Sequence, residues 1–190
     1  PHPGCAAAAV QPASAAATVS TAFFFVTPDF FTTIAARLIS GRDLEAADTV
    51  HSRWVVVINE TAAHNLWPGE DPMGRYLSIA GVPDERPREV VGVVADIPLQ
   101  LPQPSPRPAI YMSYLQQPER YPLPGANLFG SMTFMVRTAG DPLSLLASAR
   151  EVVASIDSDR PIANVITVEG QGGGRFPRRV HLAVFQLEIA

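Results

Sequence analysis

Three carboxylates in this 190-residue chain could in principle act as a catalytic acid and base: Glu70 with its neighbour Asp71, and Asp96. None of them has a partner at a spacing that identifies a catalytic pair. Asp71 precedes Pro72, and this dipeptide favours a turn because the Asp side chain bonds nearby backbone and proline fixes φ. Asp96 follows a β-branched run and is interpreted as a residue that caps the turn ending a strand. We therefore expect no catalytic residue.

Other residue types that carry chemistry are present but poorly placed. The histidines lie far apart and none forms a helical pair with a glutamate, which argues against a zinc hydrolase; they are His2, His51, His64 and His181. A single cysteine, Cys5, allows neither an internal disulfide nor a thiolate metal site. Ser131 lies outside any Gly-x-Ser-x-Gly elbow, and the glycines of 170–174 lack the spacing of a phosphate loop. We expect no metal and no cofactor.

The composition limits the class of partner. Lys and Arg total 14 against 18 Asp and Glu, which gives a net charge of -4 and argues against a nucleic-acid surface. With 47% hydrophobic residues, the chain is long enough to bury roughly two-thirds of the surface that its unfolded form would expose. No window approaches the ~18 apolar residues of a transmembrane helix, so we expect a soluble fragment.

The first third of the chain predicts a tail followed by a strand and a helix. Residues 1–22 are rich in Ala, Ser, Thr and Pro, and we expect a disordered tail because little large apolar surface offsets the cost of ordering. Phe23 to Val26 is a short apolar run that suits a buried strand. Thr27 is then a predicted N-cap, with an apolar helical face that is formed by Phe30, Phe31, Ile34 and Leu38.

The middle of the chain predicts a strand, a short helix and further strands. Val55 to Ile58 is β-branched, and Asn59 is a predicted N-cap of a helix whose buried face includes Leu66 and Trp67. A helix start also explains why residues 59–61 match a glycosylation acceptor. Three more strands are predicted, at 76–79, 90–94 and 110–114.

The last third repeats the strand-helix-strand pattern. Residues 132–137 alternate as a strand, Asp141 with Pro142 starts a helix, and residues 162–168 form another strand. The helix carries apolar residues at helical spacing, namely Leu145, Ala149, Val152 and Ile156. Residues 169–190 are predicted to be a Gly-rich linker and a C-terminal tail.

These elements predict an α+β fold of two lobes. Residues 23–53 and 131–168 would form one discontinuous, porter-like βαβ lobe, and 54–130 an inserted, strand-rich second lobe. The large aromatic residues fall where the period of each element points to the core, so we expect packing rather than a binding platform from Phe30, Phe31, Trp67 and Tyr111.

Seven short motifs occur in an order and spacing that are specific only when taken together. They are TPDFF at 27–31, LISGRDL at 38–44, VVVINETA at 55–62, LWPGEDPMGR at 66–75, VVGVVAD at 90–96, PAIYM at 108–112 and VRTAGDP at 136–142. Over residues 25–168 the series resembles the periplasmic core domain of MacB-type and FtsX-like permeases.

The resemblance implies a domain on the extracytoplasmic, periplasmic face of the cytoplasmic membrane, between two membrane helices of an ABC-transporter permease. Its partners would be the transmembrane and ATPase parts of the permease complex, and could include a second permease domain or a periplasmic partner protein. ATP is hydrolysed elsewhere in such permeases, so the domain would relay motion and need no catalytic residue. Residues 25–44 and 132–168 would share one sheet.

Two alternatives stay open from the sequence. A free-standing periplasmic module that binds a ligand or a peptide would have a deep, mostly apolar pocket, whereas a closed core would count against it. An enzyme that uses Glu70, Asp71 or Asp96 would bring two of these carboxylates and a histidine into one cleft.

Overall fold

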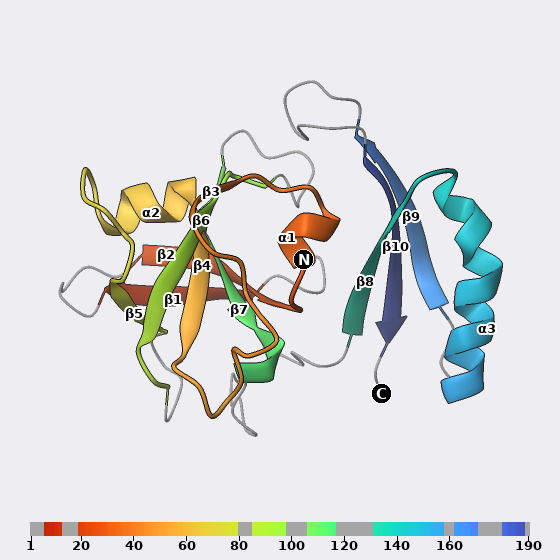
Figure 1. Ribbon diagram of the computed structural model, residues 1–190, viewed down its shortest axis with the longest axis horizontal. Coiled ribbons are helices and arrows are strands. Elements are labelled where there is room, and N and C mark those ends of the chain that lie inside the picture. Colours follow the sequence, from red (N-terminus) through yellow and green to blue (C-terminus); the bar gives the residue numbers. More distant parts are fainter. Residues whose placement is uncertain are drawn as a thin grey trace. The chain divides into compact units, whose positions relative to one another are not determined.

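The computed structural model describes residues 6–12, 19–79, 85–97, 106–116, 131–157, 162–170 and 180–188. The chain forms two compact units (Figure 1). The large unit comprises Cys5–Phe31 and Ala36–Ala126, and the small unit comprises Pro1–Gly4, Thr32–Ala35 and Asn127–Ala190. Mixed sheets with a few short helices confirm the predicted α+β class.

A seven-stranded mixed sheet builds the large unit. Its strands are β1 (Ala6–Pro12), β2 (Val19–Val26), β3 (Leu38–Gly41), β4 (Val55–Asn59), β5 (Tyr76–Ile79), β6 (Arg88–Val94) and β7 (Ala109–Ser113). They follow the order β3-β6-β4-β7-β2-β1-β5, with β2 parallel to β7 and β4 parallel to β6. Because β5 also pairs with β6, the sheet closes on itself.

The core of the large unit is centred on β4 and β7. Every residue of both strands is buried, as expected for continuous apolar runs covered on both faces. The predicted strands at 55–58, 76–79, 90–94 and 110–114 are confirmed, with small shifts at their ends. Three short helices accompany the sheet: α1 (Phe30–Thr33), α2 (Glu60–Leu66) and the 3-10 turn η1 (Tyr114–Gln116).

The predicted disordered tail is wrong for the part of it that the structure describes. Strand β1 pairs with β2 on one side, in the register Ala6 to Phe23, and with β5 on the other, in the register Val10 to Ile79. Alanine is depleted in strands and contributes little apolar area. Backbone pairing on both sides satisfies the peptide groups of this Ala-rich segment, and that non-local contribution is invisible to composition.

The predicted helix after Thr27 is shorter than expected. It ends at Thr33, and Leu38, predicted on its apolar face, begins strand β3, which pairs antiparallel with β6. Ala35 has a φ of 54°, which takes the chain out of the helix. Thr27 caps no helix in the predicted way; its carbonyl accepts a hydrogen bond from Phe30 N at 3.3 Å.

The small unit contains β8 (Ser131–Thr138), the 3-10 turn η2 (Pro142–Leu145), α3 (Leu146–Ile156), β9 (Ile162–Gly170) and β10 (Val180–Glu188). Its strands form an antiparallel sheet in the order β8-β10-β9. The predicted C-terminal tail is therefore wrong over residues 180–188, which form the central strand. Asp141 caps η2 as predicted, since its Oδ1 accepts from Leu143 N at 3.0 Å.

The predicted pairing of the first and last thirds of the chain is also wrong. Strands β2 and β3 belong to the large sheet, whereas β8 and β9 belong to the small one, so residues 25–44 and 132–168 do not share a sheet. Residues 23–31 and 36–53 join the predicted inserted lobe instead. The α3 side chains of Val152 and Ile156, which lie at helical spacing, are 59% and 82% exposed. In the described residues, no helix is long and apolar enough to cross a membrane.

Candidate functional site

The carboxylates singled out by the sequence lie in different surroundings. Glu70 forms an exposed ion pair with Arg75, and Asp71 Oδ1 accepts a hydrogen bond from Met73 N at 3.0 Å. Asp71 is thus the turn residue that the sequence predicted. His51 and His64 are both exposed, and the described residues contain no group of His, Cys, Asp and Glu side chains that could hold a metal ion. His2 lies outside the described residues.

Asp96 anchors a partly buried polar cluster, here called the polar knot, which consists of Asn59, Thr61 and Asp96. The Asp96 carboxylate accepts from Asn59 Nδ2 at 2.6 Å, from Thr61 Oγ1 at 2.8 Å and from Thr61 N at 3.1 Å. Asn59 Nδ2 also donates to the carbonyl of Arg107 at 2.8 Å. The knot therefore joins the end of β6 to the start of α2 and to the residues before β7.

Asn59 is the central residue of the knot and is only 2% exposed. Its Oδ1 accepts from Ala62 N at 2.9 Å, which confirms the predicted N-cap, and from Ala109 N at 2.8 Å. Because its amide nitrogen is buried and donates to two acceptors, it is inaccessible as a glycan acceptor. The geometry fits a residue that satisfies buried backbone groups rather than one that reacts.

The chemistry of the knot follows from these contacts. Both carboxylate oxygens of Asp96 accept hydrogen bonds, from one group of Asn59 and two groups of Thr61. Both of these residues belong to fixed parts of the fold. A general base needs a free lone pair aimed at a substrate proton, and a general acid needs a proton to give. The contacts instead fix the carboxylate as an acceptor for the first turn of α2, where negative charge is favourable. Asp96 thus caps helix α2, whereas the sequence had predicted a cap for the turn after its own strand.

A second polar cluster organises the segment Arg42–Trp54, here called the strap. Arg42 and Asp48 form a two-point ion pair, with Nη1 to Oδ2 at 2.8 Å and Nη2 to Oδ1 at 2.9 Å. Asp48 is 5% exposed, and its hydrogen bond to Arg42 is the main cause that raises the pKa of the guanidinium. The Asp48 carbonyl accepts from Ser113 Oγ at 3.1 Å, which ties the strap to β7.

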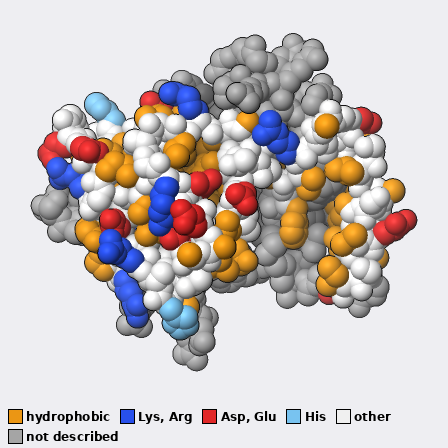
Figure 2. Space-filling view, in the orientation of Figure 1, with side chains coloured by type: hydrophobic (Ala, Val, Ile, Leu, Met, Phe, Trp, Pro, Cys, Tyr) orange, Lys and Arg blue, Asp and Glu red, His pale blue; other side chains and the backbone are white. Residues whose placement is uncertain are grey.

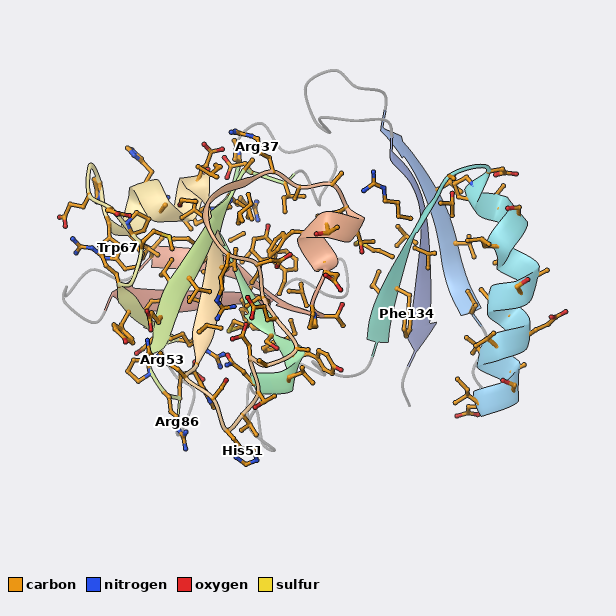
Figure 3. All side chains as sticks on the ribbon, viewed as in Figure 1. Arg37, His51, Arg53, Trp67, Arg86 and Phe134 are labelled. Atoms are coloured by element: carbon orange, nitrogen blue, oxygen red, sulfur yellow. The ribbon has the colours of Figure 1, made fainter. Side chains whose placement is uncertain are left out.

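The strap ends against a buried ion pair that the sequence did not reveal. Arg88 Nε donates to Glu85 Oε1 at 2.6 Å, and the two side chains are 0% and 3% exposed. The Arg88 guanidinium lies 4.4 Å from the ring centroid of Trp54, and that of the exposed Arg86 lies 5.5 Å from it. The labelled side chains of Arg53, Arg86 and His51 lie at this end of the large unit (Figure 3).

Gln116 completes the attachment of the strap. Its Oε1 accepts from Val55 N at 3.0 Å and its Nε2 donates to the carbonyl of Arg53 at 2.8 Å. Gln116 is fully buried, so these bonds satisfy two backbone groups at the point where the strap ends and β4 begins. Hydrophobic periodicity offers no signal for such a residue, because a buried glutamine reads as a surface position.

The aromatic residues pack as predicted. Phe31 is 2%, Tyr111 1% and Trp67 4% exposed, while Phe30 is half-buried. The Phe31 ring meets Tyr111 edge-on at 5.0 Å, and Phe24 stacks on Tyr111 at 5.4 Å. On the visible face, acidic and basic side chains of the large unit lie beside one another (Figure 2). The charges therefore form no single-sign surface on that face.

Comparisons with known proteins decide the family. A family model described as the MacB-like periplasmic core domain matches residues 3–158. This chain belongs to the MacB-like periplasmic core domain family. The family resemblance inferred from the seven motifs is thereby confirmed, although the lobe division that accompanied it was not. A search of curated proteins found no match.

Two solved structures show the same fold. The periplasmic region of MacB from Actinobacillus actinomycetemcomitans is 18% identical with a TM-score of 0.56, and the match covers 80% of this chain and 64% of that one. A domain of a proposed permease protein from Porphyromonas gingivalis is 15% identical with a TM-score of 0.52, over 95% of this chain and 72% of that one. The chain therefore spans less than two thirds of the MacB region.

Proposed function

We propose that this MacB-like core domain acts at the periplasmic face of the cytoplasmic membrane as a non-catalytic part of an ABC-transporter permease. In this role it relays motion of the complex to substrate or partner proteins, or contacts them, while the transmembrane and ATPase parts belong to the same complex. The match of the family model over residues 3–158 carries the proposal. The polar knot supports a non-catalytic role, because the Asp96 carboxylate is used to hold the end of β6 to the start of α2.

A mechanical part must transmit displacement without deforming, and the polar contacts of the large unit serve that need. The knot joins α2 to β6 and the start of β7, while the strap is fixed at Asp48 and Gln116. The sheet closes through the β5–β6 pairing, which leaves the strands little freedom to slide. The buried residues of β4 and β7 likewise count against the deep pocket of a free-standing binding module.

The test separates a mechanical from a chemical role in the complete permease that carries this domain, assembled with its ATPase in vesicles. Glu70→Gln and Asp71→Asn remove candidate catalytic groups at exposed positions, and Glu60→Gln is a matched surface control. We expect all three to keep transport and ATP hydrolysis within about twofold, since surface substitutions change little. Loss of transport in Glu70→Gln or Asp71→Asn alone, with a folded domain, would reject the proposal in favour of an enzyme.

The mechanical role itself is tested by cross-linking. A disulfide that locks the strap to β7 is built between cysteines at Asp48 and Ser113, since Ser113 Oγ lies 3.1 Å from the Asp48 carbonyl. Asp48→Cys also removes the ion pair with Arg42, so the Asp48→Cys single variant is the control for that loss. If the large unit moves as one body, transport survives the lock. Transport that stops on oxidation and returns on reduction would show that the strap moves against the sheet, and would refute the rigid-body role.

A further inference from the structure

Two arginines and a tyrosine are exposed at the end of the large unit where β4 and β6 begin. These residues, Arg53, Tyr76 and Arg86, are here called the arginine patch. The side chain of Arg53 is 70% exposed, Tyr76 is 41% exposed, and Arg86 is exposed as well. The labelled side chains of Arg53 and Arg86 lie at the same end of the unit, opposite that of Arg37 (Figure 3).

Strand pairing brings Arg53 and Tyr76 together. Glu89 of β6 lies opposite Val55 of β4 on one side and opposite Tyr76 of β5 on the other. Its carboxylate accepts hydrogen bonds from Arg53 Nη1 at 2.6 Å and from Tyr76 Oη at 3.3 Å. One carboxylate therefore fixes the positions of a guanidinium and a phenol that both reach the surface.

Arg86 is held by an aromatic ring. Its guanidinium carbon lies 5.5 Å from the centroid of the Trp54 ring, within the range of a cation–π contact. The ring is a fixed support, because its N–H donates to the Val50 carbonyl at 3.3 Å and the buried Arg88 lies 4.4 Å from its centroid. A guanidinium that contacts a ring by its face keeps its N–H donors free at its edges. Among the described residues, no ion pair involves Arg86.

The carboxylates beside the patch are covered, whereas its cations face outward. The side chains of Glu85 and Glu89 are only 3% and 19% exposed, against 70% for Arg53. Partner molecules therefore meet the guanidinium groups before the carboxylates that balance them. Although the whole chain has a net charge of -4, this surface is complementary to negative charge.

We propose that the arginine patch binds an acidic segment of a partner protein, whose carboxylates pair with Arg86 and Arg53 beside Tyr76. Arginine and tyrosine are enriched among the residues that dominate binding energy, and a guanidinium can hold a carboxylate by two parallel hydrogen bonds. Anionic lipid surfaces are bound by clusters of about four to eight Lys or Arg, so two exposed arginines fit a protein segment better. The inference gives the chemistry of the partner contact in the proposed function, and it rests on that function.

Binding of a fluorescently labelled glutamate-rich peptide to the intact chain, followed by anisotropy, tests the patch. We expect binding that weakens as salt is added, and none to a glutamine-rich peptide of equal length. Arg86→Gln should weaken binding by about tenfold or more, since it removes a charged hydrogen-bonding partner. The control Arg37→Gln removes an exposed arginine at the opposite end of the same unit and should change binding less than about twofold. Equal losses in the two variants, or equal binding of the two peptides, would overturn the proposal.

Two further measurements define what is recognised. Arg86→Lys keeps the charge but loses the planar guanidinium, and should also weaken binding several-fold; full binding by this variant would contradict two-point recognition by Arg86. Vesicles of phosphatidylglycerol and phosphatidylcholine are the membrane probe, and Arg86-dependent binding to them without peptide binding would overturn the protein partner in favour of a lipid surface. Neither assay involves transport, so their failure would reject the patch alone, whereas the transport assays above test the proposed function.

Discussion

Replacing Asp96 with alanine removes the acceptor of the hydrogen bonds from Asn59 Nδ2, Thr61 Oγ1 and Thr61 N. Hydrogen bonds to a charged acceptor contribute about 1.5–3 kcal/mol each when buried. Thr61 is only half-buried, so water replaces part of what it loses, and Asn59 keeps its bond to Arg107. We therefore expect the free energy of unfolding to fall by about 2–3 kcal/mol, less than the sum of three bonds.

Urea unfolding followed by tryptophan fluorescence measures this loss of stability in the large unit. Trp54 and Trp67 are the two tryptophans of the chain, and both are buried in the large unit, so the signal reports that unit. The unfolding midpoint should fall while the slope m stays unchanged. Asp96→Asn, which keeps one acceptor oxygen, should lose less than Asp96→Ala.

Two comparisons could refute this reasoning. Asp71→Ala removes another carboxylate, one at an exposed turn, and should cost less than about 1 kcal/mol. If Asp96→Ala were no more destabilising than Asp71→Ala, the knot would not hold the fold. The double variant with Thr61→Val should show a coupling energy of about 1 kcal/mol, because the two side chains share a hydrogen bond. Strict additivity would show that they act independently.

Two more predictions follow from the strap and its entry. Gly41→Ala should destabilise the large unit by about 2 kcal/mol or more, since an added Cβ would lie 2.1 Å from Val91 O. The control Gly69→Ala has a similar positive φ but open space around it, and should lower the free energy of unfolding by only about 1 kcal/mol. Equal losses in the two variants would refute the steric argument. Burial raises the pKa of Asp43 above its ordinary value of 3.8, so the contribution of Asp43 to the free energy of unfolding should decline as pH rises through that value. Asp43→Asn should therefore weaken the pH dependence of the urea midpoint in this range. An unchanged pH profile would contradict this.

Local chemistry in the sequence was sufficient for several elements. Asn59 was identified as an N-cap because its side chain can accept from the first turn of a helix, and the structure contains that bond. The β-branched run after Trp54 is a buried strand, and Phe31 and Tyr111 are core residues, as their periodicity indicated. Each of these predictions depends on neighbours within a few residues.

Predictions that depend on distant partners failed. The Ala-rich β1 forms because β2 and β5 both pair with it, and β3 forms instead of a longer α1 because β6 offers it an edge. Most of residues 23–53 were assigned to the wrong lobe for the same reason, since periodicity shows that a segment is a strand without showing which strand it joins. Motif order identified the family even though the division into lobes was wrong.

The candidate site illustrates the same limit. Asp96 was interpreted as a residue that ends its own strand, and nothing near it in sequence suggested otherwise. The parallel pairing of β4 with β6 brings the end of β6 beside the start of α2, with Asn59 opposite Val94, and only this register makes Asp96 a cap for a helix that lies earlier in the chain. Gln116 likewise meets Val55 N only because β7, which ends just before Gln116, pairs with β4. A polar residue thus appears as a surface position until the pairing of strands supplies its partner, which is why motif matching found this family where residue-by-residue chemistry found no site.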